Sequence, residues 1–334
     1  MLRVHNPPNL NLPPLMVQKT EAREEMESSP KIANFIRSNL LLRKDFYELS
    51  QTICDLSGKI QEMIMSFSEV DDPKDSGMAL FRAMRNRGRE DWERMRLFRN
   101  LLAHRPSGVK LSKADQKALD EVRSGLFKDT VATIKRHSTT IQNKLSAYEF
   151  KHQISLDILT PITLYLCRKC NKLISTDRFS TINCKCGEHI EDVSKTRREP
   201  LAYFDGQLQS FMKNNYWFEH GIDYLLRRKN FQTLCGVHVL GHSGNLHEID
   251  NIAESKSANF RFFCECKTAA IKTNEVFVLA GKMADTGCSK GYIFTLDKDT
   301  PKEIRHLGRS RNISIVGEAL GRTEESLLTE IRDE

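Results

Sequence analysis

The chain has 334 residues, a formal net charge of +7 at pH 7, and a hydrophobic content of 39%. This length exceeds that of most single domains and allows two or three, each with its own core. Because no run of about eighteen apolar residues occurs, we expect no membrane-spanning segment. The mild positive excess favours a polyanionic partner such as nucleic acid, although on its own it does not decide the matter.

Residues 1–30 show no regular hydrophobic period and contain two proline pairs followed by an acidic stretch. Such a segment buries little apolar surface, so we expect a mobile leader here. It also lacks the apolar core of a secretory signal, and we therefore expect a cytoplasmic protein.

A helical pattern extends over residues 31–157. Its first part places apolar residues every three or four positions, on one face of a long helix, at Phe46, Leu49, Ile53, Leu56, Ile60, Met63 and Phe67. Breaks at 71–77 and 105–108 contain Pro and Gly and separate this helix from two further helical regions. Long helices with short connections predict an antiparallel bundle.

Within the bundle, Arg99, Asn100 and His104 lie near the end of the second helical region. Their spacing resembles the R-x4-H motif of HEPN domains, helical bundles that include RNases and abortive-infection toxins. The resemblance implies a homodimer in which Arg99 holds a phosphate while His104 trades protons with a ribose hydroxyl, without a metal. The two side chains point about 140° apart on one ideal helix, so a shared site needs a local distortion or a second subunit. A cationic helix end, stabilised by the helix dipole, would contain the same residues, and both interpretations stay open.

Two close pairs of cysteines come next. Cys167 and Cys170 are separated by two residues, and Cys184 and Cys186 by one. Four such thiolates close a tetrahedral Zn²⁺ site, which predicts a small zinc ribbon with a structural role. Because the second pair is one residue short, His189 is an alternative to Cys186. A disulfide is the competing interpretation, and the absence of a secretory signal favours the metal.

This ribbon covers residues 162–192, and a linker over 193–204 leads to a third domain over 205–334. Helical and strand patterns alternate in that domain. The expected elements are a helix over 216–226, strands over 234–240, 246–253 and 260–267, a helix over 274–284, and a strand over 291–296.

The second and third of these strands contain residues suited to metal-dependent chemistry. Glu248 and Asp250 share one strand face, as do Glu265 and Lys267 on the next strand, because side chains alternate along a strand. Asp250 and Glu265 suit Mg²⁺ or Mn²⁺, which prefer oxygen ligands and also take phosphate oxygens. Such an ion lowers the pKa of a bound water, while Lys267 is placed to orient it.

Glu248-x-Asp250 followed by Glu265-Cys-Lys267, in this order of elements, resembles the PD-(D/E)XK restriction-endonuclease-like superfamily, and within it the Mrr-like and virus-defence branches. The resemblance implies metal-dependent hydrolysis of phosphodiester bonds and adds Glu219, on the first helix, as a further carboxylate. This chain has Glu-Ile-Asp in place of the Pro-Asp of the family name, which leaves the role of Glu248 open. An exposed strand pair with a surface ion pair is the alternative.

These patterns predict an α+β multidomain protein with an N-terminal α-helical bundle, a small zinc ribbon and a C-terminal α/β restriction-endonuclease-like mixed sheet. We expect a metal-dependent nuclease whose substrate is DNA, with RNA as an alternative substrate, by analogy a bacterial defence or toxin-like effector. Two alternatives remain. One is a metal-independent RNase that uses Arg99 and His104 and is targeted by the C-terminal domain, and the other is a non-catalytic nucleic-acid-binding adaptor.

Overall fold

A computed structural model describes residues 1–6, 12–38, 40–68, 113–166, 173–176, 182–183, 189–190, 201–255 and 260–331. The chain divides into two compact units. The first unit comprises Met1–Gln51, Leu156–Ile158 and Gly206–Glu334, and the second comprises Thr52–Ser155 and Leu159–Asp205. The N-terminal residues therefore belong to the same unit as the C-terminal region.

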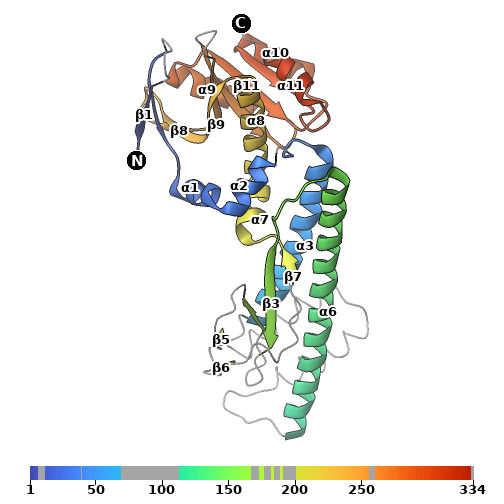
Figure 1. Cartoon of the computed structure of the whole chain (residues 1–334). Helices are drawn as coiled ribbons and strands as arrows, with labels where there is room; N and C mark the ends of the chain where they lie inside the picture. The colour runs from blue at the N-terminus through green and yellow to red at the C-terminus, as the bar shows by residue number, and fades with distance from the viewer. Residues whose placement is uncertain are drawn as a thin grey trace. The chain divides into compact units, whose positions relative to one another are not determined.

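A mixed sheet forms the centre of the first unit (Figure 1). Its strand order is β1-β2-β8-β9-β10-β11-β12, with antiparallel neighbours as far as β10 and parallel neighbours from β10 to β12. The strands are β1 (Arg3–His5), β2 (Leu15–Gln18), β8 (Gln232–Leu240), β9 (Leu246–Ser255), β10 (Phe260–Lys267), β11 (Lys290–Thr295) and β12 (Ile313–Val316).

The helices of this unit are α1 (Glu21–Ser28), α2 (Pro30–Arg37), the first part of α3 (Lys44–Ser68), α7 (Gly206–Lys213), α8 (Tyr216–Arg228), α9 (Thr273–Thr286), α10 (Lys302–Ser310) and α11 (Glu324–Glu330). The helices and strands expected over 216–296 all occur, with ends that shift by at most two residues. An α+β architecture with a mixed sheet is therefore confirmed.

Both faces of the sheet are covered. On one face, Val276, Leu279 and Met283 of α9 pack with Phe263 and Ile293 in a single buried cluster. The residues that alternate with these, Phe262 and Tyr292, point to the other face, where their rings meet 4.8 Å apart. Phe231, which follows α8, lies edge-on to Phe262 at 5.0 Å on that second face. The central strands are thus buried on both sides.

Among the first thirty residues, those that the structure describes differ from the expected mobile leader. Strand β2 adds to the open edge of β8, with Val17 opposite Val239, and β1 pairs with β2. Helices α1 and α2 follow directly, and Phe35 of α2 is fully buried against Phe211 at a ring distance of 5.8 Å. Strands of three or four residues are too short to show a hydrophobic period, which is why the pattern does not reveal them.

The second unit contains most of the long helix expected from the apolar repeat. Its elements are the remainder of α3, α6 (Lys113–His152), β3 (Thr160–Leu166), β4 (Leu173–Thr176), β5 (Ile182–Asn183), β6 (His189–Ile190) and β7 (Leu201–Tyr203). Buried Ser138 accepts a hydrogen bond from the Ala202 N–H at 2.7 Å, and buried Ser57 accepts one from the Phe204 N–H at 2.9 Å. These bonds tie the β7 segment to both long helices. Within the described residues, no helix is both long and apolar enough to cross a bilayer.

Candidate nuclease site

Strands β9 and β10 separate at the point where the two candidate metal ligands lie. Their pairing runs from Phe260 opposite Ser255 to Cys264 opposite Asn251 and ends there. Asp250 and Glu265 are the next residues on the two strands. The Cys266 N–H donates to Asp250 Oδ2 at 2.6 Å, so a side chain replaces the strand carbonyl as its acceptor. We call this end of the β9–β10 pairing, at Asp250 and Glu265, the fork. It brings the two acidic residues together.

Gly236 of β8 lies across from Asp250 in the strand register, between the pairs Cys235–Asn251 and Val237–Ile249. Its φ of +59° belongs to the left-handed region that glycine adopts without strain. Ile249 and Ile252 both join the same buried cluster, which strict alternation along β9 would not permit. The alternation predicted for β9 is therefore interrupted beside Asp250.

Glu265 interacts with two lysines, one on each carboxylate oxygen. Lys267, two residues along β10, lies 2.9 Å from Oε2, and Lys282 of α9 lies 2.6 Å from Oε1. Lys282 also donates to the main-chain oxygen of Glu248 at 2.6 Å. The sequence predicted that Glu265 and Lys267 share a strand face, whereas Lys282 was not identified.

Burial and like charges dominate the electrostatics at the fork. Burial raises the pKa of Asp250 well above its usual value, and the nearby carboxylates of Glu265 and Glu219 raise it further. Burial disfavours the charged form of Lys267, but Glu265 and Asp250 outweigh burial and raise its pKa above the usual value. The site therefore favours an added positive charge beside its carboxylates.

Glu219 of α8 interacts electrostatically with the carboxylates of Glu248 and Glu265. Burial raises the pKa of Glu219 to about 7 even though the guanidinium of Arg23 acts in the opposite direction, and Glu248 and Glu265 add to the rise. Its main-chain oxygen accepts a hydrogen bond from Asn251 Nδ2 at 3.0 Å, which connects α8 to β9. Glu219 is thus coupled electrostatically to the fork.

Arg23 of α1 is a site residue that sequence reasoning missed. Its side chain is only 5% exposed and forms an ion pair with Glu219. Its Nε donates to Glu27 at 3.2 Å, and its guanidinium lies 4.5 Å from the centre of the Tyr216 ring. A Cβ on Gly236 would overlap the guanidinium, so only glycine leaves room for it.

Glu27 extends this contact toward α8. It pairs with Lys19, and its Oε1 lies 3.2 Å from His220 Nε2. Burial would raise the pKa of Glu27, but His220 and Lys19 outweigh it and lower the pKa to about 2. Helix α1 is therefore held against α8 by charged groups that are largely shielded from water.

Among the described residues, no three His, Cys, Asp or Glu side chains stand together in a way that would hold a metal ion. Each carboxylate of the fork is instead turned to a group of the protein: Asp250 to a main-chain N–H, Glu265 to two lysines and Glu219 to Arg23. The donor set nevertheless suits a hard divalent ion, because buried carboxylate oxygens that repel one another are stabilised by a cation between them. Asp250 and Glu265 are the residues that would bind it.

Several predicted site residues lie outside the described residues. They are Arg99, Asn100 and His104 of the HEPN-like motif and Cys167, Cys170, Cys184 and Cys186 of the zinc ribbon. His189, the alternative zinc ligand, starts β6, which pairs with β5. Both motifs stay predictions.

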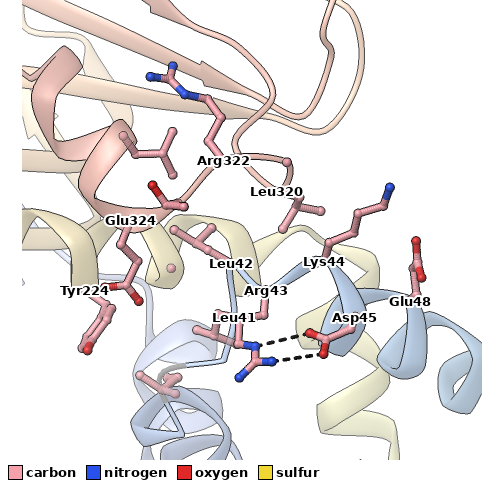
Figure 2. A pocket seen from close by; sticks show the side chains of 15 residues that line it. Leu41, Leu42, Arg43, Lys44, Asp45, Glu48, Tyr224, Leu320, Arg322 and Glu324 are labelled. Carbon is pink, nitrogen blue, oxygen red and sulfur yellow. Dashed lines mark hydrogen bonds and ion pairs between the residues drawn. The ribbon is translucent and has the colours of Figure 1, made fainter.

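A separate cavity of about 520 Å³ lies elsewhere in the first unit, between the start of α3, helix α8 and the segment before α11 (Figure 2). Arg43 points to Asp45, with their closest atoms 3.1 Å apart. Apolar and charged side chains of both signs line the cavity, including Leu41, Leu42, Lys44, Glu48, Tyr224, Leu320, Arg322 and Glu324. The carboxylates of the fork do not line it, so this cavity is distinct from the candidate site.

Comparisons with known proteins do not assign the chain to a family. No family model matches it, and no curated protein matches it. Among solved structures, the crystal structure of protein VC1899 from Vibrio cholerae aligns with a TM-score of 0.34 and 11% sequence identity. That alignment covers 95% of this chain and 56% of the Vibrio protein, so the chain spans just over half of that protein's length.

Proposed function

We propose that this protein is a divalent-metal-dependent nuclease that hydrolyses phosphodiester bonds, with DNA preferred over RNA. The observation that carries the proposal is the fork between β9 and β10, where Asp250, Glu265 and Lys267 meet. The resemblance of this acidic pattern to PD-(D/E)XK nucleases and the net charge of +7 add support.

Each residue of the fork would have a separate role in hydrolysis. Asp250 and Glu265 would hold Mg²⁺ or Mn²⁺, which when bound acidifies water and offsets charge on phosphorus. Lys267 keeps its ammonium charged, because its pKa is raised, and can hold and orient the attacking water by hydrogen bonds. Glu219 adds a carboxylate that Arg23 balances. The buried strands around the fork limit access of bulk water to the reacting groups.

The decisive experiment incubates the purified chain with supercoiled plasmid DNA and, separately, with single-stranded RNA, in Mg²⁺, Mn²⁺ or chelator. Variants Asp250→Asn and Lys267→Ala are compared with Lys302→Ala, which removes an exposed lysine from α10. We expect DNA cleavage in either metal, loss of cleavage in chelator and in the first two variants, and normal cleavage by Lys302→Ala.

Three results would contradict this proposal. Metal-dependent cleavage that persists in Lys267→Ala would remove that residue from the mechanism. RNA cleavage in chelator that is lost in His104→Ala would transfer the activity to the HEPN-like motif. A wild-type chain that binds DNA but cleaves neither substrate under any condition would favour the non-catalytic adaptor.

A further inference from the structure

Lys282 connects one helix with two strands at the fork. It belongs to α9, its ammonium contacts Glu265 on β10, and it holds the Glu248 main-chain oxygen on β9. The side chain is 16% exposed, which shields these contacts from water without closing the site. Its neighbour Met283 is anchored in the core, so the helix cannot turn the lysine away without losing packing.

The excess of carboxylates around the fork makes a cation at position 282 electrostatically favourable. The interacting groups include four carboxylates and three cations, namely Glu219, Glu248, Asp250 and Glu265 with Arg23, Lys267 and Lys282. With every group ionised they sum to one negative charge. A divalent ion makes the sum one positive charge, and a phosphodiester returns it to zero. Without Lys282, the same groups together with the divalent ion and the phosphodiester would sum to one negative charge.

We propose that Lys282 is a second catalytic lysine, which contacts a non-bridging oxygen of the scissile phosphate. This inference rests on the proposed nuclease function. If Glu265 held a divalent ion, its Oε1 would no longer be free for Lys282, and the hydrogen bond to the Glu248 main-chain oxygen would keep the Lys282 ammonium near the site. Lys267 and Lys282 lie on different oxygens of Glu265, so one can serve the attacking water while the other serves the phosphate.

The step that Lys282 assists is ordinary hydrolysis. A water oxygen forms a bond to phosphorus, one phosphorus–oxygen ester bond breaks, and a proton passes to the departing alkoxide oxygen. Negative charge grows on the non-bridging oxygens as the new bond forms, and a fixed ammonium stabilises that charge more than it stabilises the ground state.

A purely structural clamp is the competing role, since Lys282 also joins α9 to β9. The two roles differ in their effect on metal affinity. A clamp supports the geometry of the ligands, so its loss weakens metal binding and catalysis together. A catalytic lysine competes with the metal for Glu265, so its loss leaves metal affinity unchanged or higher while the reaction slows.

The test uses the full chain as Lys282→Met, which keeps an aliphatic chain of similar length, and as Lys282→Arg, which keeps the charge. Lys302→Ala serves as the matched control. Mn²⁺ affinity is measured by calorimetry, folding by the melting temperature, and cleavage under single-turnover conditions with end-labelled DNA. We expect Lys282→Met to lower the cleavage rate about 100-fold with equal or tighter Mn²⁺ binding, and Lys282→Arg to recover part of the rate.

Three outcomes would overturn the inference. Cleavage by Lys282→Met within about threefold of wild type would exclude a catalytic contact. A parallel loss of Mn²⁺ affinity and rate, in Lys282→Arg as well, would assign a structural clamp. If wild type and Lys302→Ala bind Mn²⁺ yet cut nothing, the nuclease proposal itself fails, and that result differs from a defect confined to Lys282 variants.

Discussion

The strand pair β9–β10 and the N-terminal segment, residues 12–28, bring charges to the same fork by different routes. The strand pair does so locally, because antiparallel pairing ends one residue before Asp250 and Glu265. The N-terminal segment does so through a long-range contact, because Arg23 forms an ion pair with Glu219, which lies 196 positions later in the sequence. The strand pair would supply the reacting groups of the proposed nuclease, whereas the N-terminal segment balances the charge of Glu219. The charge balance of the site depends on both the strand pair and the N-terminal segment. Substitutions in one of these regions leave the sequence of the other unchanged, so their contributions can be tested separately.

The largest effect is expected at the strand pair. Lys267→Ala and Asp250→Asn each lower metal-dependent DNA cleavage about 1,000-fold, or roughly 4 kcal/mol in activation free energy. Single-turnover rates in Mg²⁺ measure this loss, and a melting temperature close to that of wild type shows that the fold is intact. Rates within tenfold of wild type for both variants would remove the strand pair from catalysis.

Arg23→Ala tests the N-terminal side of the comparison. It leaves the largely buried Glu219 without its cation, so we expect a loss of about 3 kcal/mol in unfolding free energy. Chemical denaturation measures the loss. Arg23→Ala combined with Glu219→Gln should recover part of it, because the uncompensated charge is removed. Equal stability of Arg23→Ala and wild type would mean that the ion pair contributes nothing to the fold.

Gly236→Ala tests the contact between the two regions. A Cβ here would overlap the Arg23 guanidinium and would also require a non-glycine residue at a φ of +59°, so we expect a loss of about 2 kcal/mol. The backbone strain should persist in an Arg23→Ala background, but the clash should not. A double-mutant cycle therefore isolates the contact, and strictly additive losses would show that the guanidinium does not lie on Gly236.

Glu27→Gln should produce the smallest effect, with a distinct pH dependence. Because the folded state lowers the pKa of Glu27 from 4.5 to about 2, its contribution is complete above pH 4.5 and is lost as pH falls toward 2. We expect roughly 1 kcal/mol at neutral pH after solvent screening, seen as a lower melting temperature. The difference from wild type should vanish near pH 2, and a pH-independent difference would point to lost packing instead.

The acidic part of the site was accessible to sequence reasoning because its determinants are local. Glu265 and Lys267 lie two residues apart on one strand, and alternation alone puts them on one face. The end of the β9–β10 pairing and the interruption opposite Gly236 were not accessible, because they depend on how three strands fit together. Lys282 was missed because a lysine on an amphipathic helix ordinarily faces solvent.

By itself, the sequence determined the order of helices and strands over 216–296 through its hydrophobic period. Residue spacing predicted Asp250, Glu265 and Lys267 as candidate site residues. Only the tertiary structure decided that Arg23 and Lys282 neutralise the carboxylates of the fork. Those contacts follow from the addition of the four-residue strand β2 to the sheet and from the packing of α9 on the sheet. Such arrangements are set by the free energy of burying distant surfaces together, which leaves no periodic pattern along the chain.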